Sequence, residues 1–178
     1  MKILVMYKSK TGFTKKYAQM IAEELDATLM DIKEATAEKI SSYDVCVYGG
    51  GLYAGMVNGL KQVKEMFVKS GAKRLVVFAT GATPNEAAES VLYEMWKNNF
   101  SPEELESIAH FYMQSGICYE KMGVMDKMMM KMMSKVLSKK TDMNDYDEAM
   151  AQAIARSYDI SDKKYIEPVI EYLKEMKK

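Results

Sequence analysis

The sequence predicts a doubly wound α/β fold, in which a parallel sheet of five strands is covered by helices on both faces. Short apolar runs alternate with segments whose apolar residues recur every three or four positions, as strands and helices do when they alternate along a chain. Right-handed crossovers then place each helix against the sheet. With 178 residues, 48% of them apolar, the chain is long enough to bury the core of one such domain, which we expect to span residues 1–178.

Each predicted strand is a short apolar run, and the third and fourth runs lead into glycine-containing loops. In chain order, the strands are expected at Lys2–Tyr7, Thr28–Asp31, Tyr43–Gly51, Arg74–Gly81 and Ala109–Tyr119.

Helices are predicted wherever apolar residues repeat at helical spacing. A small helical piece follows the second strand, and three helices follow the fifth. The predicted stripes are Tyr17, Ala18, Ile21, Ala22 and Leu25; Leu60, Val63 and Phe67; Tyr93 and Trp96; the methionine-rich segment Lys121–Ser138; Tyr146, Ala149, Met150, Ala153 and Ile154; and Ile166, Val169, Ile170 and Leu173. Gly71 closes the second of these, and Thr83–Glu86 and Ser101–Glu104 have the spacing of capping boxes with proline at the first helical position.

Composition excludes several classes of function. The 25 acidic and 25 basic side chains give a formal net charge of zero, so the overall balance calls for neither nucleic acid nor an anionic membrane. No apolar run reaches the roughly 18 residues that a membrane span needs. Met1 leads directly into a strand rather than a signal peptide, so we expect a cytoplasmic protein.

Cysteine and histidine usage argues against a metal site. Cys46 and Cys118 lie far apart in apolar segments without C-x-x-C spacing, which predicts buried reduced thiols rather than a disulfide or metal ligands. The one histidine, His110, excludes a His-rich centre and is expected to be packed or hydrogen-bonded. Tyr93 and Trp96 are expected in the core. Tyr119 is a weak candidate for the border of a substrate cleft.

Ligands of a doubly wound sheet bind outside the carboxyl ends of its strands. The loops at this edge after the first, third and fourth strands are Lys8–Phe13, Gly49–Gly55 and Thr80–Thr83, which hold six of the ten glycines. This concentration of glycine predicts one ligand held jointly by the three loops.

The first loop has the composition of a phosphate site. Backbone amides at the start of the helix near Phe13 attract an anion, and the hydroxyls of Ser9, Thr11 and Thr14 add donors. Gly12 allows close approach of the backbone. The alternative is that these residues only turn a strand into a helix. The pattern is neither G-x-x-x-x-G-K-[ST] nor G-x-G-x-x-G, which disfavours a nucleoside triphosphate and a dinucleotide.

The segment "SKTGFT" resembles the [ST]-x-T-G-x-T phosphate loop of flavodoxins, and it directly follows a strand that ends in an aromatic residue, Tyr7. The resemblance implies FMN as the cofactor and a flavodoxin-like strand order of 2-1-3-4-5, with an extra methionine-rich helix after strand five. It also implies three sets of cofactor-binding residues. They are Ser9, Lys10, Thr11, Gly12, Phe13 and Thr14 around the phosphate; Gly50, Gly51, Leu52, Tyr53 and Ala54 along one side of the flavin, with Tyr53 as a stacking partner; and Thr80, Gly81 and Ala82 at its other edge.

Two features differ from electron-carrier flavodoxins, which are strongly acidic and place an aromatic ring in the third loop. This chain is neutral, and its third loop, "ATGATPNE", has no aromatic residue. The chain is more similar to the flavodoxin-domain group that includes the bacterial quinone-dependent protoporphyrinogen oxidase, through a "YD-x-x-V-x-G" strand, the helix "VKEMFVK" and the inserted "DKMMMKMM". This resemblance implies an FMN-dependent oxidoreductase acting on a planar small molecule such as a quinone or tetrapyrrole. No catalytic side chain is assigned.

Two other classes of function stay open. An electron-transfer flavodoxin serving a protein redox partner would have an acidic face around the flavin edge. A non-catalytic flavodoxin-like module would keep the fold but lose the phosphate donors, and the intact "SKTGFT" argues against it.

The methionine-rich helix allows three interpretations. We favour a helix that packs one side on the domain and solvates Lys127, Lys131 and Lys135. The second interpretation is a pliable lid, or a surface for peripheral membrane contact, since thioethers adapt to irregular shapes and lysine favours lipid headgroups. A copper site built on Met-x-x-Met spacing is the third and is disfavoured for a cytosolic protein. A homodimer is a further open alternative.

Overall fold

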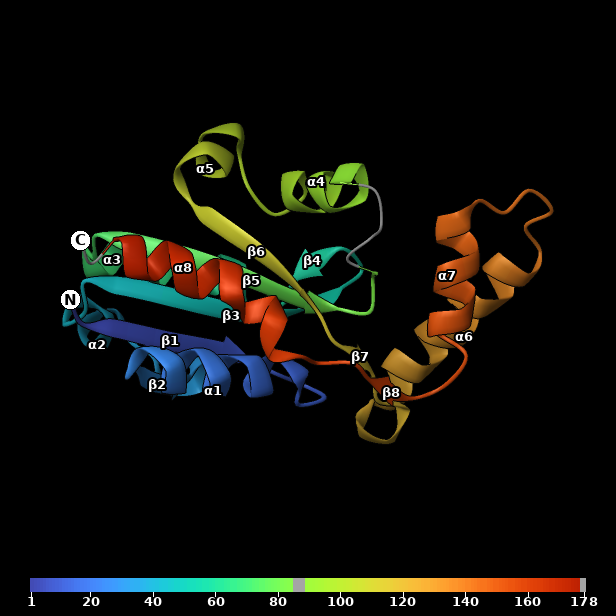
Figure 1. Ribbon diagram of the computed structural model, residues 1–178, viewed down its shortest axis with the longest axis horizontal. Helices are drawn as coiled ribbons and strands as arrows, with labels where there is room; N and C mark the ends of the chain where they lie inside the picture. Colours follow the sequence, from blue (N-terminus) through green and yellow to red (C-terminus); the bar gives the residue numbers. More distant parts are fainter. Residues whose placement is uncertain (85–88, 177–178) are drawn as a thin grey trace.

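The central sheet has five parallel strands in the order β2-β1-β3-β5-β6, and the short β4 pairs antiparallel with the end of β3 (Figure 1). The computed structural model describes residues 1–84 and 89–176. Because β4 lies off the central path, this order is the predicted 2-1-3-4-5, and the predicted fold class is confirmed. The strands are β1 (Ile3–Lys8), β2 (Thr28–Asp31), β3 (Val45–Tyr53), β4 (Met56–Val57), β5 (Arg74–Gly81) and β6 (Ala109–Gln114).

Helices cover both faces of the sheet because the strands alternate their side chains between two cores. In β1, Ile3, Val5 and Tyr7 join the core on one face, whereas Leu4 and Met6 join the core on the other. The first face is covered by α1 (Phe13–Leu25), the 3₁₀ turn Lys163–Ile166 and α8 (Glu167–Glu175). The second face is covered by the 3₁₀ turn Ile32–Glu34, α2 (Ala37–Ser41), α3 (Leu60–Ser70), α4 (Glu89–Lys97) and α5 (Pro102–Ser107).

The helix ends follow their predicted signals where the structure describes them. Gly12 starts α1 with φ 105°, and Gly71 ends α3 with φ 66°, both in the left-handed region that favours glycine. The capping box at Ser101–Glu104 is present at the start of α5. The other predicted box, at Thr83–Glu86, lies partly outside the described residues.

The predicted fifth strand is too long at its carboxyl end. The chain leaves the sheet at Ser115, whose amide and hydroxyl both donate to the carbonyl of Gly81 at 2.8 and 3.2 Å. The next residues form β7 (Gly116–Ile117), which pairs antiparallel with β8 (Tyr158–Asp159). Glycine is required at 116, because a Cβ there would overlap the carbonyl oxygen of Tyr158.

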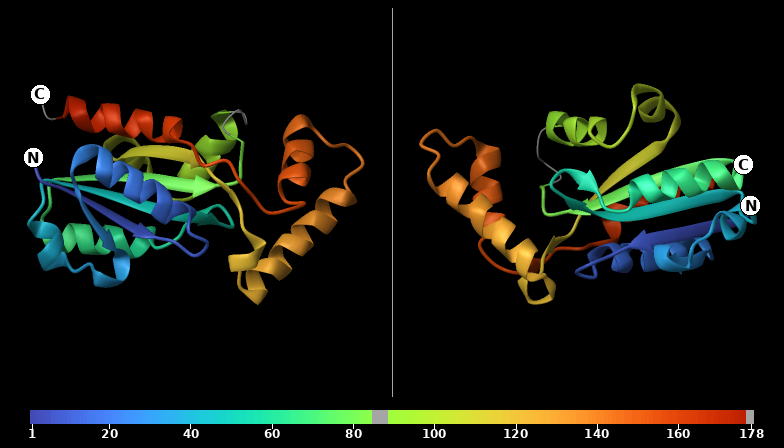
Figure 2. Two further views of the ribbon diagram at one scale, coloured as in Figure 1. Left: turned by 60° about the horizontal axis from the view of Figure 1, so that its bottom comes forward. Right: turned by 180° about the vertical axis from the view of Figure 1, so that it is seen from behind.

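The segment between β7 and β8 forms an arm of two helices that projects beyond the carboxyl ends of the strands (Figures 1 and 2). After the 3₁₀ turn Tyr119–Lys121 come α6 (Val124–Ser138) and α7 (Asp145–Ala153). The arm has its own small core, made of Ile117, Leu137, Met150 and Ile154. Within the described residues, no helix is both long enough and apolar enough to cross a bilayer.

Two predictions about aromatic and histidine packing have different outcomes. Trp96 is 5% exposed and His110 packs beside it, with ring centroids 4.8 Å apart and the His110 Nδ1 2.8 Å from the carbonyl oxygen of Ile108, as expected. Tyr93 was expected in the core but is 57% exposed. It lies on the outer side of α4, where the Lys97 ammonium covers its ring.

The two cysteines differ in environment, so the prediction that both are buried is wrong for Cys118. Cys46 lies in the middle of β3 and is fully buried, and burial raises the pKa of its thiol to about 12. Cys118 is partly exposed, because β6 has already ended and the chain has entered the arm. Both thiols are free.

This difference predicts selective labelling. We expect the thiol reagent dithiobis(nitrobenzoate) at neutral pH to modify only Cys118 in the native protein. Cys46 is inaccessible, and its raised pKa disfavours the reactive thiolate relative to the thiol. Native Cys118→Ser protein should give no reaction, whereas the same variant in denaturant should release the colour of one thiol. Rapid labelling of native Cys118→Ser protein would contradict the burial of Cys46.

Candidate functional site

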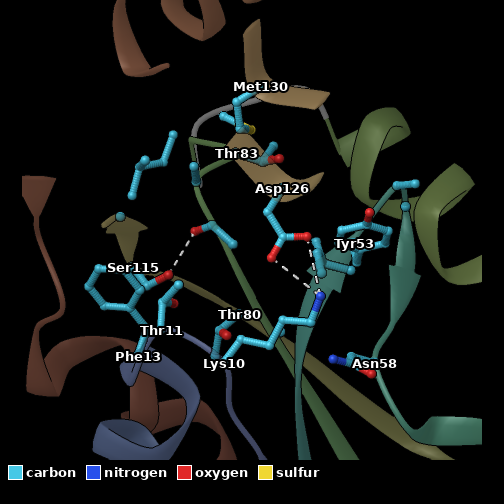
Figure 3. A pocket seen from close by; sticks show the side chains of 18 of the residues that line it. Lys10, Thr11, Phe13, Tyr53, Asn58, Thr80, Thr83, Ser115, Asp126 and Met130 are labelled. Atoms are coloured by element: carbon cyan, nitrogen blue, oxygen red, sulfur yellow. Dashed lines mark hydrogen bonds and ion pairs between the residues drawn. The ribbon is translucent and has the colours of Figure 1, made fainter. Parts of the chain in front are cut away.

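A cavity of about 540 Å³ lies between the carboxyl ends of β1, β3 and β5 and the arm (Figure 3). The three predicted loops form one side of it. The cavity also lies within the roughly 300–1,000 Å³ typical of small-molecule sites. The predicted site residues that line it are Lys10, Thr11, Phe13, Thr14, Gly51, Leu52, Tyr53, Ala54, Thr80, Gly81 and Ala82.

Three predicted site residues do not line the cavity. The Ser9 hydroxyl accepts a hydrogen bond from the Gly12 amide at 3.1 Å, so these two residues close the first loop on itself. Gly50 is buried on the side of β4, where an added Cβ would lie 2.8 Å from the carbonyl oxygen of Asn58. Ser9, Gly12 and Gly50 therefore shape the loops in this conformation, while their neighbours face the cavity.

Loops one and three are joined by a buried pair of hydroxyls. The Oγ1 atoms of Thr14 and Thr80 are 2.8 Å apart, and both residues line the cavity. Gly51 of the second loop lies against them, since an added Cβ would be 3.4 Å from Thr14 Oγ1. The lack of a side chain at Gly51 keeps this polar cluster accessible from the cavity.

The amino end of α1, which carries a partial positive charge, lies beside the hydroxyl pair of Thr14 and Thr80. The first turn of α1 holds no acidic residue, and the first amides of a helix have no intrahelical acceptor. Thr11 lies directly before this turn and faces the cavity (Figure 3). This polar corner suits a phosphate group.

The second loop is held in place by a buried amide. Asn99, two residues after α4, accepts from the Val57 amide at 2.8 Å and donates to the Gly55 carbonyl at 2.8 Å. Between them the chain turns through Ala54 and Gly55, whose φ angles are 49° and 78°. A non-glycine residue with positive φ is uncommon, and such strain concentrates at functional sites.

The hydroxyl of Tyr48 makes a further hydrogen bond to this segment. It donates to the carbonyl of Asn58 at 2.5 Å, and Asn58 lines the cavity. Burial raises the pKa of Tyr48, so its phenol stays protonated and remains a donor at physiological pH.

An ion pair connects the first loop to the arm. The Lys10 ammonium is 3.3 Å from Asp126 of α6, and it also lies 4.4 Å from the centre of the Tyr53 ring (Figure 3). The Lys10 side chain is 53% exposed, so by the usual range for surface pairs this contact contributes less than about 1 kcal/mol. A ligand that stacks on this face of Tyr53 would displace a weakly held side chain.

Sequence reasoning missed the residues that the arm and α4 bring to the site. The cavity lining also includes Lys8, Gly55, Asn58, Thr83, Val91, Glu94, Met95, Asn98, Ser115, Gly116, Ile117, Met122, Asp126, Met129, Met130, Met133, Met150 and Ile154. The spacing of the methionines identified an apolar helix, but it did not show which side faces a ligand. Tyr119, the candidate cleft residue, instead donates to the Ile154 carbonyl at 2.5 Å within the arm.

A family model described as a flavodoxin domain matches residues 4–144 of the chain. The chain belongs to the flavodoxin domain family. In this flavodoxin-domain protein, the matched residues include all three loops of the cavity and the whole of α6.

The chain is also similar to individual proteins. An uncharacterized protein of Methanocaldococcus jannaschii is 27% identical over 117 residues, which are 62% of this chain and 73% of that protein. A flavodoxin from the domain Archaea is 15% identical with a TM-score of 0.45 over 64% of this chain and 85% of that chain. Oxidised flavodoxin 1 from Bacillus cereus is 15% identical with a TM-score of 0.44 over 68% and 89%. A flavoprotein in complex with FMN from Lactobacillus acidophilus is 19% identical with a TM-score of 0.39 over 64% and 91%.

Membership of the flavodoxin domain family supports FMN as the cofactor, and the residues present fit it. The polar corner formed by Thr11, Thr14 and the start of α1 suits the phosphate, while Gly51 leaves open space beside it. The loop around Tyr53 offers an aromatic ring for stacking. Bound FMN supplies one- and two-electron transfer, and the chain supplies its orientation and electrostatic surroundings.

Proposed function

We propose that this protein is an FMN-dependent oxidoreductase that transfers electrons through the flavin to or from a planar small molecule. The observation that carries the proposal is the two-sided lining of one cavity. The three loops present hydroxyls and backbone to the cofactor, and the arm presents Met122, Met129, Met130, Met133 and Met150 opposite them. Flexible thioether side chains suit a flat apolar ring system beside the flavin.

The chain's own groups orient and shield the reactants in this proposal. Thr11 and the start of α1 hold the phosphate, and Tyr53 contacts the flavin ring. The methionines of α6 reduce water access to the cavity from the side of the arm. We assign no side chain to proton transfer.

A quinone or a tetrapyrrole is the substrate class that we propose. The tetrapyrrole option comes from the resemblance of β3, α3 and α6 to the flavodoxin-domain group that includes protoporphyrinogen oxidase. A cytoplasmic location is part of this proposal.

The alternative, an electron-transfer flavodoxin serving a protein partner, requires an acidic surface around the flavin. Among residues 1–84 and 89–176, the charged residues that line the cavity are Lys8, Lys10, Glu94 and Asp126, which are two of each sign. The balance among these described residues supports the small-molecule reaction over docking of a basic redox protein, which an acidic surface would attract.

The proposal is tested by reoxidation of the reduced protein. We expect the purified protein to bind one FMN per chain and, after anaerobic reduction, to be reoxidised much faster by a short-chain quinone than by oxidised ferredoxin. For a tetrapyrrole substrate the direction is reversed: the oxidised protein should accept electrons from a porphyrinogen, which becomes a porphyrin. Met129→Ser/Met133→Ser should slow the small-molecule reaction about 30-fold without loss of FMN, because each change removes apolar contact area worth roughly 1 kcal/mol.

The control is Val68→Ser, which changes a side chain that is 79% exposed on α3 and does not line the cavity. It should leave the reoxidation rate unchanged. Fast exchange with ferredoxin, together with unchanged quinone kinetics in the methionine variant, would instead assign the protein to the electron carriers.

A further inference from the structure

The outer face of α6 carries an apolar stripe that the cavity does not use. Met125, Met128, Met132 and Val136 are spaced by three and four positions and are 72%, 55%, 63% and 68% exposed. We call these four residues the outer stripe. Contiguous exposed apolar side chains of this kind usually mark an interaction surface.

The opposite side of the same helix holds four of its other apolar residues. Met129, Met130 and Met133 line the cavity, and Leu137 is buried against α7. The interpretation that we favoured from sequence, a helix packed on the domain through one side, therefore explains this inner side. It leaves the outer stripe without a partner among the described residues.

Lysines flank the outer stripe along its whole length. Lys127, Lys131 and Lys135 recur every four positions and are all exposed. The one carboxylate of α6, Asp126, turns inward and pairs with Lys10. The outer face of α6 is therefore apolar and cationic, although the whole chain is neutral.

We propose that the outer face of α6 docks on an anionic lipid surface. Met125, Met128, Met132 and Val136 would enter the boundary between headgroups and acyl chains, while the three lysines reach anionic headgroups beside them. This proposal concerns a surface distinct from the cavity and does not depend on which substrate the cavity takes.

The charge pattern disfavours a second copy of the chain as the occupant. Two α6 helices packed through their outer stripes would align the lysines of one copy with those of the other, and α6 offers no outward carboxylate to neutralise them. Like charges at such spacing are destabilising. An anionic bilayer neutralises all three lysines at once.

The shape of the surface favours a lipid over an acidic protein. The outer stripe is one helix wide and lies on an arm that projects from the end of the molecule (Figures 1 and 2). A stable protein interface needs roughly 800 Å² on each partner with matching shape. A bilayer needs no matching shape and accepts a single convex helix.

Vesicle sedimentation tests the proposal. The FMN-loaded protein should sediment with vesicles of equal parts phosphatidylcholine and phosphatidylglycerol and remain in solution with phosphatidylcholine alone. Lys127→Gln/Lys131→Gln/Lys135→Gln should weaken partitioning on the order of 100-fold, as expected from the contribution of three lysines near an anionic surface. Met128→Ser/Met132→Ser should weaken it at least tenfold.

The matched control removes the same charge elsewhere. Lys61, Lys69 and Lys73 are exposed lysines on and just after α3, outside the arm. Their replacement by glutamine should leave partitioning unchanged. An equal loss in this control would show that only net charge matters and would overturn the proposal.

Insertion of the stripe has its own spectroscopic readout. Trp96 is buried, so its emission should not respond to lipid, whereas Met132→Trp adds a tryptophan on the outer face. We expect a blue shift and quenching by brominated acyl chains when anionic vesicles are added to this variant. Absence of vesicle binding by the unmodified protein overturns the proposal, as does dimerisation in lipid-free solution that Met128→Ser/Met132→Ser abolishes.

Discussion

Thr11→Glu should weaken FMN binding on the order of 100-fold or more while leaving the protein folded. Thr11 faces the polar corner at the start of α1 and lines the cavity. A carboxylate there would lie close to the ionised phosphate, and a pair of like unit charges about 4 Å apart repel by about 4 kcal/mol at an effective dielectric constant near 20. Titration of the apoprotein with FMN, followed by quenching of flavin fluorescence, measures the loss.

Thr11→Gln is the control for size, because it has nearly the same shape as the glutamate without its charge. It should bind FMN within a fewfold of the unmodified protein. Riboflavin, which lacks the phosphate, should bind Thr11→Glu and Thr11→Gln with similar affinity. If the glutamate weakens riboflavin as strongly as FMN, the phosphate does not lie at this corner.

Thr14 is less suitable for this experiment, although sequence alone ranks it with Thr11. Its side chain is 3% exposed and is hydrogen-bonded to Thr80. A glutamate at this position would bury a charge in the core of the loop cluster and would destabilise the fold itself. The structure therefore separates two threonines that the loop motif treats alike.

The fold could be predicted from sequence because each sheet element carries a local signal. The stripe from Tyr17 to Leu25 is buried in α1 as predicted, and the boundaries of β2 and β5 are the predicted ones. Burial on a sheet imposes these periodicities on the sequence directly. The three ligand loops follow from the same elements, since the carboxyl ends of parallel strands share one edge.

The arm could not be predicted in the same way, because its placement depends on contacts distant in sequence. The break after Gln114 depends on Gly116 meeting Tyr158, which lies 42 residues further along the chain. Its contribution to the cavity depends on which side of α6 turns inward, and methionines occur on both sides. Helical spacing predicts which residues share a face of a helix, but it does not identify what each face packs against.

The three consecutive glycines of the second loop include one that lines the cavity, as predicted, and two that serve packing instead. All three glycines suggested a ligand loop, and Gly51 faces the cavity. Gly49 and Gly50 instead allow neighbouring groups to pack: an added Cβ would overlap the ring of Phe78 at the first and would crowd Asn58 at the second. A glycine in a strand can serve close packing or the approach of a ligand, and the sequence alone does not distinguish these two roles.

Gly49→Ala should accordingly be the most destabilising small substitution in the sheet. Gly49 of β3 lies directly opposite Phe78 of β5, and the Phe78 ring, which is fully buried, occupies the space above the glycine. The added methyl group forces the ring into a core without room, and overpacking of this kind typically costs about 1–3 kcal/mol. We expect a loss near the upper end, about 3 kcal/mol, in urea unfolding of the FMN-free protein, where ligand binding adds no stability.

Two variants make this prediction specific to the contact. Gly123→Ala should change stability by less than about 0.5 kcal/mol, because Gly123 has an ordinary φ of −68° and an added Cβ would meet its nearest neighbour only at 3.9 Å. Phe78→Leu in the Gly49→Ala background should recover part of the lost stability, since the smaller leucine side chain leaves room for the added methyl group. We expect a coupling free energy on the order of 1 kcal/mol between the two positions. Additive losses would place the strain elsewhere in β3. Recovery would show that Phe78 selects glycine at 49, the first residue of the second loop.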